Sequence, residues 1–125
     1  MEFEDMTFDI RGAIFTVSKE LAPGLLESVY EAALTFELKK LGYTVQTQVG
    51  LPVQYKSEHL ELGFRIDLIV NGLIIIEVKS VELLHDVHKK QLLTYLKLSH
   101  KKVGFLVNFN SAVLEDKISL VRIIN

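Results

Sequence analysis

The chain has 125 residues, a length that predicts one domain spanning residues 1–125. Hydrophobic residues make up 49% and charged residues 24%, as in globular domains, which excludes a disordered or low-complexity chain. The sequence contains no cysteine, so disulfides, zinc–thiolate sites and iron–sulfur clusters are excluded. A formal net charge of −2 argues against a broad phosphate-binding surface.

The sequence predicts no membrane segment and no secretory signal. No run of about 18 apolar residues occurs. The first residues are acidic and lack the basic and apolar regions of a signal peptide. We therefore expect a cytoplasmic protein.

Two helices are predicted in the first third of the chain. Apolar residues recur with helical spacing over residues 8–21, and Ala22-Pro23-Gly24 then breaks the pattern. A second helix is predicted over residues 25–41, where Gly42 provides the stop.

The period then changes to two, which indicates strands. We expect strands over residues 43–49 and 51–56, and Pro52 favours an edge position for the second of them. Residues 59–70 alternate most clearly, and Asn71-Gly72 follows as a hairpin turn. One face of this strand is predicted to hold Leu60, Leu62, Phe64, Ile66, Leu68 and Val70.

The remaining elements complete an α/β pattern. Residues 73–79 are apolar on both faces until the end of the segment, which is typical of a central strand. A helix from the N-cap Asp86 to residue 99 precedes strands over residues 102–109 and 118–124. Strand, helix and strand in this order predict a right-handed parallel crossover, and hence a mixed central sheet flanked by helices.

The central strand ends in charged residues. Glu77 and Lys79 are two residues apart, so both side chains point to one face. A carboxylate at the end of a buried strand needs a partner or a metal ion, because an unpaired buried charge is costly. The alternative is an ion pair in water at the strand end.

Asp67, on the preceding strand, shares that face only in one register. A two-residue turn at Asn71-Gly72 places Asp67 opposite Ile76 and sends Glu77 to the other face. A three-residue turn over residues 70–72, or an equivalent bulge, places Asp67 on the face of Glu77 and Lys79. The alternative role for Asp67 is a solvent-facing residue paired with Arg65.

Two helices add polar groups to this arrangement. His88, Gln91 and Tyr95 form a stripe at helical spacing on the third helix. Glu27 lies at the edge of the apolar side of the second helix and can reach inward. As alternatives, Glu27 interacts only with the helix dipole, Gln91 is an exposed amide and Tyr95 is an ordinary core residue.

These residues in this order resemble a known family. Gly24-Leu25-Leu26-Glu27-Ser28-Val29-Tyr30 is similar to the signature of the bacterial GxxExxY family. Glu27, Asp67, Glu77-Val78-Lys79 and Gln91…Tyr95 resemble the PD-(D/E)XK nuclease superfamily, in its QxxxY branch, with Ile66 where proline often precedes the aspartate. The resemblance covers residues 8–124 and implies a restriction-endonuclease-like αβββαβ core.

The resemblance also implies a function and a cofactor. It implies a nuclease that hydrolyses phosphodiester bonds in DNA or RNA with Mg²⁺ or Mn²⁺. Asp67, Glu77 and the Val78 carbonyl would hold the metal, and Glu27 would support the metal or a second ion. Lys79 would orient water or stabilise negative charge, and Gln91 and Tyr95 would position the phosphate or the catalytic groups.

Two other classes of function remain open. One is a catalytically inactive nuclease-fold module that binds nucleic acid or a protein partner, as the near-neutral charge would suit. The other is a structural interaction domain that forms a homodimer through the edge strand near Pro52 or through the first helix.

Overall fold

The computed structural model describes residues 3–125, apart from the side chains of residues 61 and 62. Three helices and five strands form the expected α/β pattern. In chain order they are α1 (Phe3–Glu20), α2 (Glu27–Lys40), β1 (Val45–Tyr55), β2 (Glu58–Val70), β3 (Ile74–Lys79), α3 (Asp86–Ser99), β4 (Val103–Asn108) and β5 (Leu120–Ile124). None of these helices is long and apolar enough to cross a bilayer.

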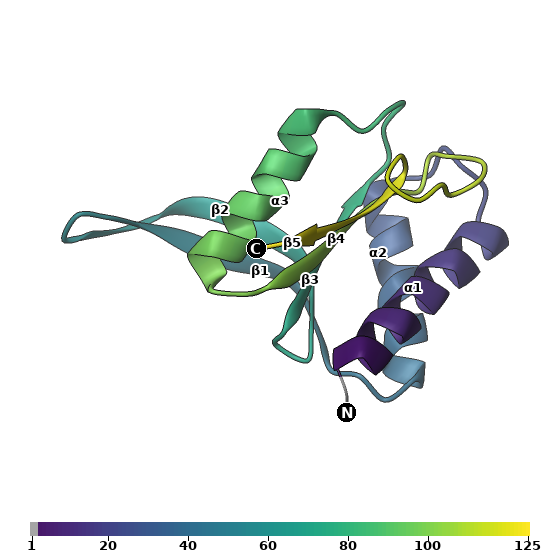
Figure 1. Ribbon diagram of the computed structural model, residues 1–125, viewed down its shortest axis with the longest axis horizontal. Coiled ribbons are helices and arrows are strands. Elements are labelled where there is room, and N and C mark those ends of the chain that lie inside the picture. The colour runs from purple at the N-terminus through teal and green to yellow at the C-terminus, as the bar shows by residue number, and fades with distance from the viewer. Residues whose placement is uncertain (1–2) are drawn as a thin grey trace.

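The strands form one mixed sheet in the order β1-β2-β3-β4-β5. β3 and β4 are parallel and are joined through α3, as predicted, whereas the other neighbours are antiparallel. Helices α1 and α2 cover one face of the sheet and α3 covers the other (Figure 1).

Each face of the sheet has its own core. The core beneath α1 and α2 includes Ile10, Ile14, Leu34, Leu68 and Ile76. The core beneath α3 includes Ile66, Ile75, Leu92, Leu96 and Leu106. β3 contributes to both cores, so the prediction of a central strand is confirmed.

Several predicted boundaries differ from the structure. The expected strands 43–49 and 51–56 are one edge strand, β1, because Gly50 pairs with Arg65 instead of breaking the ladder. Helix α1 begins at Phe3, five residues before the predicted start at Phe8, and buries Met6. The N-cap of α3 is His85 rather than Asp86, since the His85 N–H donates to Nδ1 of His88 (2.9 Å).

The predicted single apolar face of residues 60–70 is wrong. Ile66 packs in the core beneath α3, whereas Leu68 and Val70 pack beneath α1 and α2. The change of face occurs at Asp67, which is missing from the ladders on both sides. Leu60 and Phe64 remain about 40% exposed, and the side chain of Leu62 lies outside the described residues.

The contact between α3 and the sheet yields a first prediction. A Cβ added at Gly104 would lie 2.9 Å from Cδ1 of Leu92, whose side chain is fully buried. We expect Gly104→Ala to lower the free energy of unfolding by about 1–3 kcal/mol through overpacking, measured by chemical denaturation. Gly12→Ala is the matched control, because no described atom lies within 4 Å of its added Cβ. Equal stability of both variants would contradict this packing.

Candidate active site

The β2–β3 register brings Asp67 and Glu77 together. Leu68 pairs with Ile76 and Val70 with Ile74, which places Asp67 opposite Glu77. The turn has three residues, as this arrangement required, but they are 71–73 rather than 70–72. The Leu73 N–H donates to the Val70 carbonyl (2.9 Å), with Asn71 and Gly72 at positive φ.

The two carboxylates replace the backbone ladder at this point. The Asp67 N–H donates to Oε2 of Glu77 (2.8 Å), and the Val78 N–H donates to Oδ2 of Asp67 (2.8 Å). Each acid thus accepts a main-chain hydrogen bond from the opposite strand. This exchange fixes both carboxylates side by side where β2 and β3 separate.

Burial disfavours ionisation of both acids, and nearby acidic charges add to this effect. Glu77 is 3% exposed, and burial together with the nearby Asp67 raises the pKa of Glu77 to about 8. Burial also raises the pKa of Asp67, against the lowering effects of the Val78 N–H and Lys79. A cation bound between the two carboxylates would favour their ionised forms, which burial alone disfavours.

Lys79 lies at the end of β3, half-buried, beside the acids. Its positive charge lowers the pKa values of both Asp67 and Glu77. No ion pair within 4.0 Å joins Lys79 to an acid among the described residues. The ammonium group is thus near the carboxylates without being bonded to them.

Glu27 joins the same site from α2. Its Oε2 accepts the main-chain N–H of Ser80 (3.0 Å), directly after Lys79, and the Ser80 hydroxyl donates to the Leu25 carbonyl (2.9 Å). The preceding turn is fixed by the buried Tyr30, whose hydroxyl donates to the Ala22 carbonyl (2.6 Å). Glu27 therefore points inward, as predicted, and its carboxylate binds the main chain just after β3.

Sequence reasoning missed Glu31 and Gln48. The amide nitrogen of Gln48 donates to Oε1 of Glu31 (2.8 Å) and to Oδ1 of Asp67 (3.3 Å). Burial raises the pKa of Glu31, and the charge of Asp67 adds to this rise. Glu31 follows Glu27 by one helical turn, a spacing that could have revealed it. Gln48 adopts φ +50°, which no sequence pattern indicates.

Helix α3 places Tyr95 near the acids. Burial, with Glu77 and Asp67 nearby, raises the pKa of Tyr95 to about 12. Its ring packs against Phe64, with centroids 5.1 Å apart. Gln91 is half-buried one turn earlier, and it makes no side-chain hydrogen bond within the described part of the chain. His88, the third member of the predicted stripe, caps the helix instead.

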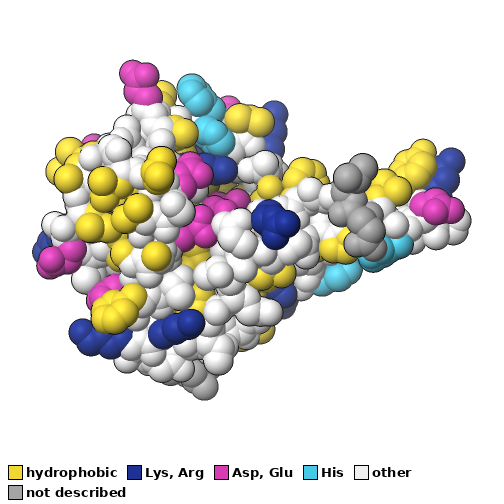
Figure 2. Space-filling model, turned by 180° about the vertical axis from the view of Figure 1, so that it is seen from behind, with side chains coloured by type: hydrophobic (Ala, Val, Ile, Leu, Met, Phe, Trp, Pro, Cys, Tyr) yellow, Lys and Arg dark blue, Asp and Glu magenta, His cyan; other side chains and the backbone are white. Residues whose placement is uncertain are grey.

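The donor set suits a small hard cation. Among the side chains that the structure describes, no three of His, Asp or Glu form a ready metal cage. Mg²⁺ does not require one, because it is held by one or two carboxylates and keeps several waters. Asp67 and Glu77 supply such carboxylates. Figure 2 shows acidic side chains gathered where β1 and β2 begin to project from the rest of the protein.

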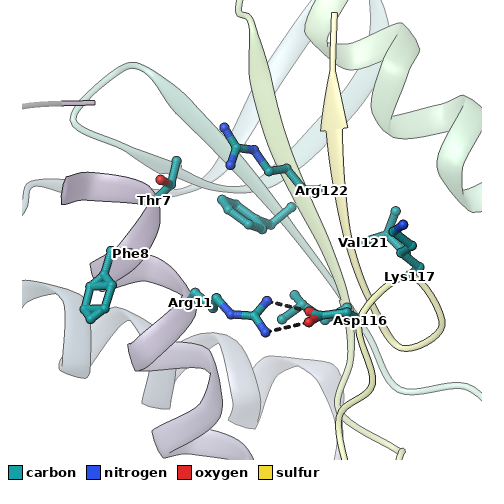
Figure 3. A pocket seen from close by; sticks show the side chains of 9 residues that line it. Thr7, Phe8, Arg11, Asp116, Lys117, Val121 and Arg122 are labelled. Carbon is teal, nitrogen blue, oxygen red and sulfur yellow. Dashed lines mark hydrogen bonds and ion pairs between the residues drawn. The ribbon is translucent and has the colours of Figure 1, made fainter. Parts of the chain in front are cut away.

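A separate hollow of about 390 Å³ lies between α1 and β5. Arg11 reaches from α1 across this hollow to Asp116, with a bidentate ion pair (Figure 3). Its lining includes only this one acid, so it lacks the paired carboxylates found between β2 and β3.

Comparison with known proteins identifies one family. The family model described as the PD-(D/E)XK nuclease superfamily matches residues 4–121. The mixed sheet with flanking helices agrees with the restriction-endonuclease-like α/β fold expected of that match. No significant match occurs among curated proteins or solved structures.

The raised pKa of Glu77 predicts a pH-dependent stability. The folded protein holds this proton up to about pH 8, whereas an unfolded glutamate releases it near pH 4.3. The free energy of unfolding of the metal-free protein should therefore fall as pH rises from about 4.3 to 8. Chemical denaturation in EDTA at intervals from pH 5 to 9 measures this fall.

Two variants test whether Glu77 is the group responsible for this pH dependence of stability. Glu77→Gln should flatten the pH dependence, because the amide does not titrate. Glu20→Gln, at an exposed position of α1, should preserve it. A pH dependence that persists unchanged in Glu77→Gln would disprove the assignment.

Proposed function

The chain belongs to the PD-(D/E)XK nuclease superfamily, and we propose that it is a metal-dependent nuclease that hydrolyses phosphodiester bonds in nucleic acid. The observation that carries this proposal is the reciprocal bonding of Asp67 and Glu77. This bonding holds the half-buried carboxylate of Asp67 and the buried carboxylate of Glu77 beside Lys79. Lys79 forms an ion pair with neither acid. We also propose that residues 1–125 act as one domain.

The cofactor we propose is Mg²⁺ or Mn²⁺. Asp67, Glu77 and the carbonyl of Val78 would hold it, and Glu27 would support this ion or a second one. When bound, such an ion would neutralise charge on the phosphate and would help to activate water as the nucleophile. The raised pKa of Glu77 supports this assignment, because a cation would restore the charged form of the acid.

The protein's own groups account for the remaining steps. Lys79 orients the attacking water or stabilises the negative charge that develops on the phosphate, since its ammonium group lies near both acids without an ion pair. Tyr95 and Gln91 position the phosphate or the catalytic groups from α3. The proximity of Tyr95 to Asp67 and Glu77 supports this role.

We further propose that the chain belongs to the GxxExxY group and the QxxxY branch of the superfamily. Gly24 (φ +93°), Glu27 and Tyr30 are the residues of the first motif. Gly24 lies in the turn between α1 and α2, Tyr30 donates a hydrogen bond to Ala22 in that turn, and Glu27 accepts the N–H of Ser80 beyond β3. Gln91 and Tyr95 form the second motif on the site-facing helix.

An inactive member of the same fold is the rival interpretation. Such a protein has no need for a lysine that is held near two acids and bonded to neither. We therefore favour catalysis. Association with a second copy or with a protein partner stays a prediction.

Nuclease assays test the proposal. Wild-type protein should cleave at least one of single- and double-stranded DNA and RNA in Mg²⁺ or Mn²⁺, and not in EDTA. Glu77→Gln and Lys79→Ala should each reduce the rate by about 10²–10³-fold, as expected for loss of a group that stabilises the transition state.

Calorimetry separates the two roles and provides the control. Glu77→Gln should abolish Mg²⁺ binding, whereas Lys79→Ala should keep it. Glu20→Gln should match wild type in both assays. No cleavage and no metal binding by folded wild-type protein would refute the nuclease and support the inactive module.

A further inference from the structure

β1 and β2 extend beyond the rest of the sheet as a two-stranded arm (Figures 1 and 2). β3 pairs with β2 only between Leu68 and Val70. β1 and β2 stay paired as far as Tyr55 and Glu58, with a register shift between Pro52 and Val53. At about 3.3 Å per residue, the stretch from Gln48 to Lys56 is roughly 25 Å long. The arm therefore projects from the candidate active site.

The arm has one apolar and one polar face. Leu51 pairs with Phe64 on the apolar face, which packs on α3 through the contact of Phe64 with Tyr95. Gly50 pairs with Arg65, and Gln54 pairs with His59. Positions 50 and 54 of β1 share a face opposite to that of Leu51, so Arg65 and His59 lie on the polar face.

The polar face leads directly into the acids. Nη1 of Arg65 donates to the carbonyl of Gln48 (3.3 Å), and the Gln48 side chain binds both Glu31 and Asp67. Farther out, Nδ1 of His59 lies 3.3 Å from Oε1 of Gln54. Arginine, glutamine and histidine thus form a row of hydrogen-bonding groups that starts beside the catalytic centre.

We propose that this polar face enters the major groove of B-form double-stranded DNA while a phosphate lies at Asp67 and Glu77. The proposal rests on the nuclease function proposed above and names its substrate. The major groove of B-DNA, about 12 Å wide, admits a two-stranded β-ribbon, and arginine, lysine and glutamine read its base edges. The roughly 25 Å arm covers about seven base pairs at 3.4 Å each.

The form of the arm disfavours other nucleic acids. The major groove of A-form RNA is deep and too narrow for side chains to read. Single strands are held by stacking on aromatic residues, and the aromatic residues of the arm, Phe64 and the exposed Tyr55, lie on the apolar face rather than on the polar face. Duplex DNA is therefore the substrate that fits the polar face.

The arm offers two variants that change no catalytic group. A Cβ at Gly63 would collide with the main-chain oxygen of Leu51, so Gly63→Ala distorts the ribbon. Lys56→Ala removes a cation at the tip, together with its contact with the ring of Tyr55, and keeps the Lys56 carbonyl that accepts a hydrogen bond from Gln54. The matched controls are Gly12→Ala, with open space around its added Cβ, and Lys39→Ala, at the far end of α2.

The experiment measures fluorescence anisotropy of a labelled 24-base-pair DNA in Mg²⁺, with the full chain carrying Lys79→Met so that the DNA stays intact. We expect at least 10-fold weaker binding of double-stranded RNA of the same sequence. Lys56→Ala should weaken DNA binding several-fold and reduce the salt slope by about one. Gly63→Ala should weaken binding at least as much, whereas both controls should match the parent.

Shortening the duplex on one side tests the reach of the arm. Affinity should drop once fewer than about seven base pairs remain beyond the cleavage site, and Gly63→Ala should remove this length dependence. If wild type cleaves nucleic acid but the arm variants bind DNA normally, or RNA binds equally well, the arm proposal alone is overturned. A wild type that neither binds Mg²⁺ nor cleaves overturns the nuclease proposal as well.

Discussion

The exchange of hydrogen bonds between Asp67 and Glu77 determines much of this structure. Each carboxylate takes the place of a backbone acceptor on its own strand. The sheet can therefore open at this point without leaving those two amide groups unpaired, which would be costly in a buried position. The exchange also ends the β2–β3 ladder, changes the face of β2 and leaves the rest of β1 and β2 free to project as an arm.

The same exchange sets the electrostatics of the site. Hydrogen bonds from main-chain N–H groups lower the pKa values of Asp67 and Glu77. Burial has the larger effect, so both pKa values rise. The hydrogen bond from Gln48 lowers the pKa of a third acid, Glu31, but burial outweighs this effect as well. The neutral donors, together with the ammonium group of Lys79, therefore offset only part of the cost of ionising these acids. Such an arrangement favours binding of an external cation over internal pairing.

The sequence predicts most of the fold because its signals there are local. The hydrophobic period identifies the helices, and the apolar run over residues 73–76 identifies the central strand. The site residues Glu27, Asp67, Glu77, Lys79 and Tyr95 follow from strand parity together with the family resemblance. Gln48 and the change of face at Asp67 do not, because both arise from contacts between distant strands. A one-residue change in the turn after Val70 would have reversed the prediction, so the register needed the structure.

Ser80 links the site to the order in which the chain folds. Its N–H and hydroxyl bind Glu27 and Leu25, which lie more than fifty residues earlier in the sequence. Contacts of such high separation carry a large loop-closure cost and tend to form late. The sheet alone would bring Asp67 to Glu77, but Glu27 arrives only when the helical hairpin docks. A nascent or partly unfolded chain in which the helices have not docked would therefore lack Glu27 at the candidate site.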